Sequence, residues 1–70
     1  MRNIVYPELE GQIAKHGYIK SDIAKRLGIS HRHFTNKLKG RVVFTWDEVE
    51  TLQRDFFPDV SKDEIMQRVQ

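Results

Sequence analysis

The stretch of residues 20–40, KSDIAKRLGISHRHFTNKLKG, limits most narrowly what this 70-residue chain can fold into. Apolar residues recur at helical spacing on both sides of a glycine, and they are Ile23, Ala24 and Leu27 before it and Phe34 and Leu38 after it. Gly28 suits the left-handed conformation that a helix adopts before a sharp turn. The small side chain of Ala24 allows two helices to approach closely. This spacing predicts a helix-turn-helix, in which the second helix is presented to the major groove of DNA.

The composition indicates one small domain without covalent or metal cross-links. Seventy residues lie near the lower limit at which a single hydrophobic core holds a fold together. The absence of cysteine excludes disulfides and thiolate metal sites and favours a reducing cytoplasm. His31 and His33 are two positions apart and lie on different faces of a helix, so we expect no metal site and no cofactor. Apolar runs are too short for a membrane span, and MRNIVYPELE lacks the pattern of a signal peptide, so we expect a cytoplasmic protein.

Positive charge is concentrated around the predicted turn. The net charge is only +2, but residues 15–41 contain eight lysines or arginines and one acidic residue. Residues 42–70 contain three basic and seven acidic residues. A basic half that includes a helix-turn-helix is typical of a protein that binds a polyanion. The alternative interpretation is a solvated helix face with surplus lysine, and the acidic half could equally contact a protein partner.

Hydrophobic periodicity and capping signals predict an all-α domain of five helices. The predicted helices cover residues 6–15, 20–27, 31–39, 46–55 and 62–69. In the first of them, Leu9, Ile13 and Ala14 form the apolar stripe. Ser30 is a favourable N-cap for the third helix, and Gly40 is a natural stop after it.

The second half of the chain contains two helix-start signals. The sequences TWDE, from Thr45, and SKDE, from Ser61, are both capping boxes. Before the first box, either Val43 or Phe44 is expected to fill the core. Helical spacing after the first box predicts an inward face formed by Trp46, Val49 and Leu52, which Phe56 could extend.

Helical geometry divides the third predicted helix into a buried and an exposed face. With Phe34 and Leu38 in the core, the residues expected to reach base edges are His31, Arg32, Thr35 and Asn36. Arg32 suits a bidentate contact with guanine, Asn36 suits one with adenine, and Thr35 can meet a thymine methyl group. The residues expected to bind phosphates are Lys20, Lys37, Lys39 and Arg41.

Residues 18–46, YIKSDIAKRLGISHRHFTNKLKGRVVFTW, resemble the Cro and lambda-type repressor helix-turn-helix family, especially small phage and prophage regulators of Gram-positive bacteria. The resemblance implies a compact five-helix, lambda-repressor-like domain that binds double-stranded operator DNA. It also implies a homodimer on two half-sites about one helical turn apart. By resemblance, the DNA contacts fall on Lys20, His31, Arg32 and Asn36. The family usually has Thr-Gln where this chain has Ile19-Lys20, so the second helix loses its threonine cap, a loss of about 1 kcal/mol.

Other functions stay open at the level of the sequence. A phage modulator or antirepressor of this fold would bind a repressor protein instead of, or besides, DNA. Its apolar contact surface would draw on Val42, Val43, Phe57, Val60, Met66 or Val69. An antitoxin is a third possibility, although no segment resembles a toxin-binding tail. An enzyme is not expected, because no nucleophile–base pair, phosphate loop or pair of catalytic carboxylates can be picked out.

Overall fold

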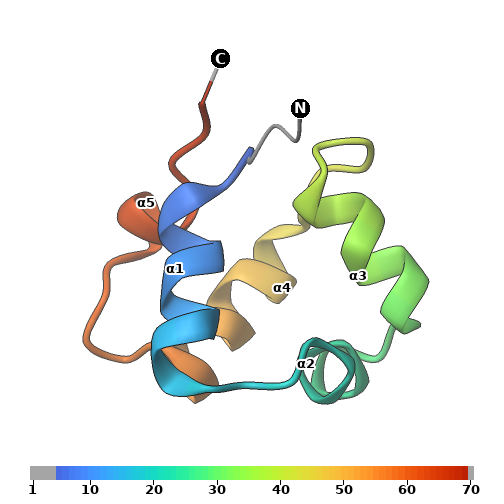
Figure 1. The fold of residues 1–70 in the computed structure, drawn as a ribbon, viewed down its shortest axis with the longest axis horizontal. Helices are drawn as coiled ribbons and strands as arrows, with labels where there is room; N and C mark the ends of the chain where they lie inside the picture. Colours follow the sequence, from blue (N-terminus) through green and yellow to red (C-terminus); the bar gives the residue numbers. More distant parts are fainter. Residues whose placement is uncertain (1–4, 70) are drawn as a thin grey trace.

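The computed structural model describes residues 5–69, which form five α-helices and one π-helical segment (Figure 1). The elements in chain order are α1 Pro7–His16, α2 Lys20–Leu27, α3 His31–Leu38, α4 Trp46–Thr51, η1 Leu52–Phe56 and α5 Lys62–Ile65. Residues 5–69 contain no strand, so the prediction of an all-α fold is confirmed. Because the bundle has only short helices, none within these residues has the length and hydrophobicity needed to cross a membrane.

The first four helices lie within one residue of the predicted ranges, apart from a change of helix type in the fourth. Helix α1 begins and ends one residue later than predicted, because Tyr6 is its N-cap and Gly17 its C-cap. Helix α2 has the predicted bounds, and its N-cap residue Ile19 makes no side-chain capping hydrogen bond. Helix α3 ends at Leu38, one residue early. The predicted fourth helix is α-helical in α4 and continues as the wider π-helix η1.

The last predicted helix is wrong in length. Helix α5 covers only four residues, Lys62–Ile65, instead of the predicted 62–69. Residues 67–69 leave the helix, and the backbone N–H of Val69 donates to the carbonyl oxygen of Val5 at 2.9 Å. This tertiary hydrogen bond connects the two ends of the described chain and competes with a further helical turn.

The hydrophobic core lies between all five helices. Its largest cluster of buried residues consists of Tyr6, Leu9, Ile13, Ile23, Ala24, Phe34, Leu38, Leu52, Phe57 and Ile65, and Val49 on α4 is buried as well. Phe44 packs against this core edge-to-face with Tyr6 and Phe34, at ring-centroid distances of 5.4 and 6.1 Å. Of the two residues expected to fill the core before α4, Val43 and Phe44, it is therefore Phe44 that does so. Two predictions about apolar residues are wrong, because Ala14 is exposed and Phe57, predicted as a surface residue, is fully buried.

Helix α4 begins at its predicted capping box but turns its tryptophan outward. Thr45 accepts a hydrogen bond from the backbone N–H of Glu48, and the Glu48 carboxylate accepts one from the N–H of Thr45. Trp46 is 65% exposed, which corrects the prediction that it faces the core. The core position before α4 is filled by Phe44, which packs edge-to-face on Tyr6 and Phe34, whereas Trp46 lines an open apolar pocket at the surface.

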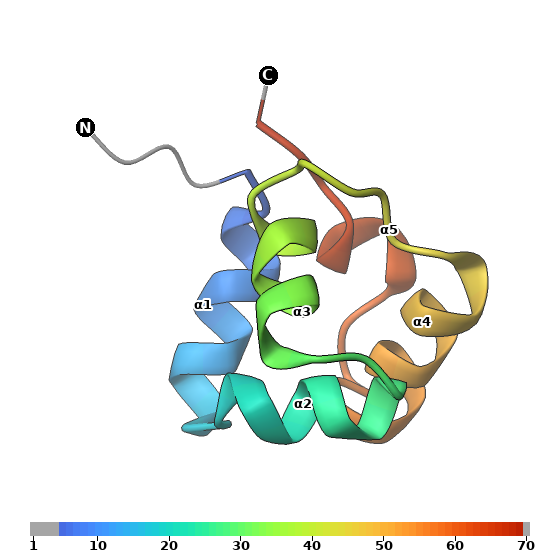
Figure 2. The same cartoon turned by 90° about the vertical axis from the view of Figure 1, so that its right-hand side faces the viewer.

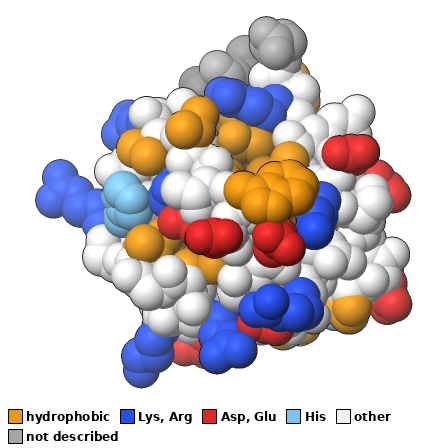
Figure 3. All heavy atoms as spheres, turned by 180° about the vertical axis from the view of Figure 1, so that it is seen from behind, with side chains coloured by type: hydrophobic (Ala, Val, Ile, Leu, Met, Phe, Trp, Pro, Cys, Tyr) orange, Lys and Arg blue, Asp and Glu red, His pale blue; other side chains and the backbone are white. Residues whose placement is uncertain are grey.

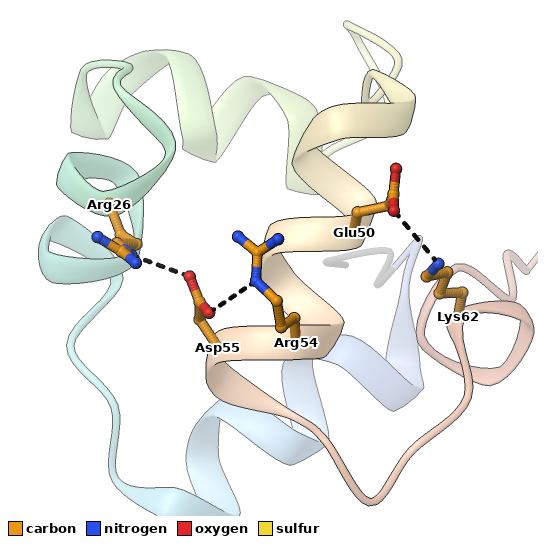
Figure 4. A network of polar contacts seen from close by, with 5 residues as sticks. All are labelled: Arg26, Glu50, Arg54, Asp55 and Lys62. Atoms are coloured by element: carbon orange, nitrogen blue, oxygen red, sulfur yellow. Dashed lines mark hydrogen bonds and ion pairs between the residues drawn. The ribbon is translucent and has the colours of Figure 1, made fainter.

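Figures 1 and 2 show α2 lying across one end of the bundle, with α3 standing on it at the outer side. An ion pair between Arg26 Nε on α2 and Asp55 Oδ2 on η1, at 2.9 Å, attaches α2 to the other half of the chain. Arg54 Nε donates to the other Asp55 oxygen at 3.1 Å (Figure 4). These hydrogen bonds from Arg54 and Arg26 lower the pKa of Asp55 below its ordinary value.

Candidate nucleic-acid interface

The connection between α2 and α3 fixes the direction in which α3 leaves the bundle. Gly28 adopts a left-handed conformation with φ of 78°, and the next N–H, that of Ile29, donates to the Ala24 carbonyl at 3.0 Å. Ala24 is buried, as expected for a residue where two helices approach closely. The Ser30 hydroxyl then accepts a hydrogen bond from the N–H of His33 at 3.0 Å and begins α3 as predicted.

One of the predicted phosphate-binding lysines is part of the interior. Lys37 is only 2% exposed, and its ammonium group donates to the Val43 carbonyl at 3.0 Å and to the Glu48 carboxylate at 2.9 Å. It also lies 5.7 Å from the centroid of the Phe44 ring. All of these partners come from the connector and α4. The prediction that Lys37 binds phosphate is therefore wrong, because the ammonium group is buried and already bonded.

Glu48 is the partner that makes the burial of Lys37 tolerable. Its side chain is only 12% exposed, and one oxygen accepts hydrogen bonds from the Lys37 ammonium and the Thr45 backbone N–H. Partial burial raises the pKa of this carboxyl, but the hydrogen bonds from Thr45 and Lys37 lower it by more, so the pKa lies below its ordinary value of 4.5. Glu48 therefore remains a carboxylate near neutral pH.

The outward face of α3 gathers most of the predicted base-reading residues. At about 100° of rotation per residue, Arg32, Thr35, Asn36 and Lys39 fall within an arc of about 100° on the side opposite Phe34. Arg32 and Lys39 are exposed, and the other two are half-buried. His31 is exposed in the first turn of the helix, and its carbonyl accepts a hydrogen bond from the Thr35 hydroxyl at 2.9 Å. The Thr35 methyl group takes no part in that bond.

The three remaining predicted phosphate contacts differ in how freely they can bind an anion. Lys39 and Arg41 are exposed, and no ion pair within residues 5–69 involves either of them. Arg41 is placed by its own backbone N–H, which donates to the carbonyl of Asn36 at 3.0 Å. The ammonium group of Lys20 pairs with the Glu10 carboxylate at 3.0 Å, so a phosphate must compete with that carboxylate.

Ion pairing concentrates the unpaired positive charge around α3. Of the eight cations in residues 15–41, three pair with carboxylates from outside that segment, namely Lys20, Arg26 and Lys37. Those without an ion pair inside the described part of the chain are Lys15, Lys25, Arg32, Lys39 and Arg41. The last three lie on or directly after α3, where they favour a polyanionic ligand.

The buried lysine carries a sequence signal that the prediction did not use. Lys37 follows Phe34 by three positions and directly precedes Leu38, so helical spacing places it on the flank of the buried face. Because lysine is rarely buried unless it is paired, the sequence favoured the interpretation that the Lys37 side chain is exposed. The capping-box residue Glu48 is a potential partner, but the sequence alone does not indicate that α4 brings it to α3.

Comparison of the chain with protein-family models, with curated proteins and with solved structures gives no match. Functional inference therefore depends on the chemistry and placement of the side chains. Within residues 5–69 no group of three or more histidine, cysteine, aspartate or glutamate side chains is arranged to hold a metal ion.

Proposed function

We propose that this protein is a lambda-repressor-like helix-turn-helix regulator that binds operator DNA through the outward face of α3. The observation that supports the proposal most is the placement of Arg32, Thr35, Asn36 and Lys39 on one side of a helix whose opposite side is fixed in the core. An α-helix of this width fits the major groove of B-DNA. The face combines side chains that distinguish bases with a cation for the phosphates.

The side chains divide into two roles by chemistry. The guanidinium group of Arg32 can donate twice to guanine, and the Asn36 amide can both donate to and accept from adenine. Each such bidentate pair discriminates against a wrong base by about 1–3 kcal/mol. Lys39 and Arg41 at the end of α3 supply charge for phosphates, which gives affinity for any sequence and a dependence on salt. The proposal assigns Lys20 a weaker phosphate contact, because Glu10 already pairs with it.

The decisive experiment selects preferred duplexes from a random DNA library and measures binding to the selected and to a scrambled duplex by fluorescence anisotropy. Arg32→Ala and Asn36→Ala should each weaken binding to the selected duplex by roughly 5- to 150-fold, the equivalent of one bidentate contact. Binding to the scrambled duplex should change far less. Lys39→Ala should weaken both duplexes alike and flatten the salt dependence by about one unit.

Two variants serve as matched controls. Arg54→Ala removes an exposed arginine on η1, so it changes the net charge as Arg32→Ala does but leaves α3 unchanged. Lys25→Ala removes an exposed lysine from α2 and matches Lys39→Ala. If Arg32→Ala and Asn36→Ala keep the discrimination of the wild type, the assignment of α3 as the reading helix is wrong.

The alternative function, a phage modulator or antirepressor that binds a repressor protein, makes a different prediction for the same selection. No sequence would be enriched, and binding would be weak, salt-sensitive and indifferent to sequence. Binding of the DNA that flanks the protein's own gene, compared with a scrambled duplex of equal length, separates the two functions directly. The exposed side chains of Val43 and Val69 are compatible with a protein contact, whereas Phe57 is buried and drops out of that surface.

A further inference from the structure

The segment after α5 lies against the turn that follows α3, although the two are far apart in the sequence. The backbone N–H of Val69 donates to the carbonyl oxygen of Val5 at 2.9 Å, which fixes this segment beside the start of α1. The neighbouring Arg68 reaches the turn, because a Cβ placed on Gly40 would lie only 2.8 Å from a guanidinium nitrogen of Arg68. Figures 1 and 2 show both segments at the same end of the molecule, opposite to α2.

Arg68 is supported by an aromatic ring. Its guanidinium carbon lies 5.3 Å from the centroid of the Tyr6 ring, and Tyr6 is itself buried in the core. Arg68 is exposed, and no ion pair within residues 5–69 involves it. A guanidinium over a ring keeps the N–H groups at its edge available, and their fork matches the oxygens of a phosphate. The side chain is therefore held in place while its donors remain free for an anion.

The turn brings Arg68 beside two cations that are expected to bind DNA phosphates. Lys39 and Arg41 flank Gly40 in the chain and are also exposed. Because Gly40 has no Cβ, the guanidinium of Arg68 can approach its backbone closely. Figure 3, the view from behind Figure 1, shows basic side chains near the upper edge of the molecule, with acidic side chains below them and to the right. Positive groups from two distant segments thus meet at one turn, where they attract a polyanion.

The charge of Arg68 is hidden in the sequence by its surroundings. Residues 42–70 contain three basic and seven acidic residues, so this half of the chain has a negative net charge. The structure separates the three cations, because Arg54 pairs with Asp55 and Lys62 pairs with Glu50. Arg68 has no such partner among residues 5–69, so no carboxylate described there has to be displaced before a phosphate binds.

We propose that Arg68 binds a backbone phosphate of the DNA duplex together with Lys39 and Arg41, so that the segment after α5 extends the DNA contact beyond the helix-turn-helix. This inference rests on the proposed binding of DNA by α3. A phosphate contact is electrostatic and independent of sequence. Arg68 therefore adds affinity and salt dependence for every duplex, and it adds no discrimination between bases.

The test measures binding to the scrambled duplex by fluorescence anisotropy at several salt concentrations. Arg68→Gln removes the charge and keeps much of the side-chain stem. It should flatten the salt dependence by about one unit and weaken binding roughly five- to tenfold at about 0.1 M salt. Binding to the selected duplex should weaken by the same factor. Arg68→Lys retains the charge and should keep the salt dependence of the wild type. Circular dichroism under the same conditions establishes that each variant is folded.

The matched control is Arg54→Gln, which removes an equal charge from an exposed arginine on η1 and should leave the salt dependence unchanged. An unchanged salt dependence in Arg68→Gln overturns the proposal. An equal flattening in Arg54→Gln also overturns it, because the effect would then come from the net charge alone. Failure of the proposed reading by α3 looks different, since the wild type would then bind selected and scrambled duplexes alike while the contribution of Arg68 would still be measured on both.

Discussion

Replacement of Glu48 by glutamine tests whether the buried Lys37–Glu48 pair is a central element of this fold. Glutamine is an accepted residue at this position of a capping box, so it can still accept a hydrogen bond from the Thr45 N–H. The substitution therefore removes the negative charge while it keeps the start of α4. The Lys37 ammonium, only 2% exposed, would retain the Val43 carbonyl and a neutral amide oxygen as partners.

The expected loss is about 3 kcal/mol of unfolding free energy. Removal of one partner of a buried pair costs about 3–5 kcal/mol, because an uncompensated charge stays buried. The low end applies here, since the amide oxygen still accepts from Lys37 and the Glu48 side chain is 12% exposed. In a domain of this size, 3 kcal/mol corresponds to roughly 12–24 °C in melting temperature.

Thermal and urea unfolding followed by circular dichroism measure the effect, and a double variant makes the test specific. Lys37→Met with Glu48→Gln removes the buried charge altogether, so it should be about 2 kcal/mol more stable than Glu48→Gln alone. Glu50→Gln is the control, because it removes an equal charge from a half-exposed pair with Lys62 at 3.8 Å and should cost less than about 1 kcal/mol (Figure 4). Two results would refute the reasoning. One is an equal loss of unfolding free energy in Glu48→Gln and Glu50→Gln, and the other is a double variant less stable than Glu48→Gln.

Three further predictions concern pH, the glycines and DNA. Folding lowers the pKa of Glu48, so the ionised carboxylate contributes fully to the unfolding free energy above about pH 4.5, and this contribution is lost as the pH falls through the lowered pKa. The difference in unfolding free energy between the wild type and Glu48→Gln should therefore shrink in acid. Gly28→Ala should cost about 1 kcal/mol in urea unfolding from its positive φ alone, and Gly40→Ala should cost more, because its Cβ would also lie 3.3 Å from a Val5 methyl carbon. Lys37→Met should leave the salt dependence of DNA binding unchanged, whereas a flattening by about one unit would restore Lys37 as a phosphate ligand.

Local signals predicted the helices and the turn between α2 and α3. The left-handed Gly28 and the capping hydroxyl of Ser30 act within a few residues of their own positions, so a sequence pattern contains all the necessary information. The same holds for the capping box at Thr45. The grouping of Arg32 and Asn36 on one face of α3 was predictable for the same reason, because helical periodicity alone determines it.

The wrong predictions about α5 and Trp46 concern how segments far apart in the sequence pack against each other. The length of α5 is limited by a hydrogen bond from Val69 to Val5 at the other end of the described chain. The exposure of Trp46 depends on how far the first turn of α4 lies from the core, and Phe44, not Trp46, makes the aromatic contacts with Tyr6 and Phe34. A capping box fixes where a helix begins but not its depth in the bundle, so no local pattern could have placed this tryptophan.

The burial of Lys37 gives this residue a part in the proposed function without contact with DNA. Which side chains of α3 point outward depends on the rotation of the helix about its axis, and a shift of one residue corresponds to about 100°. Phe34 and Leu38 restrict this rotation only through shape, whereas the hydrogen bonds of Lys37 attach one flank of α3 to the connector and α4 in a defined direction. Such directional bonds distinguish nearby rotations that apolar packing tolerates. The lysine predicted to bind phosphate therefore acts from inside the domain, by holding Arg32 and its neighbours toward the groove that they would read.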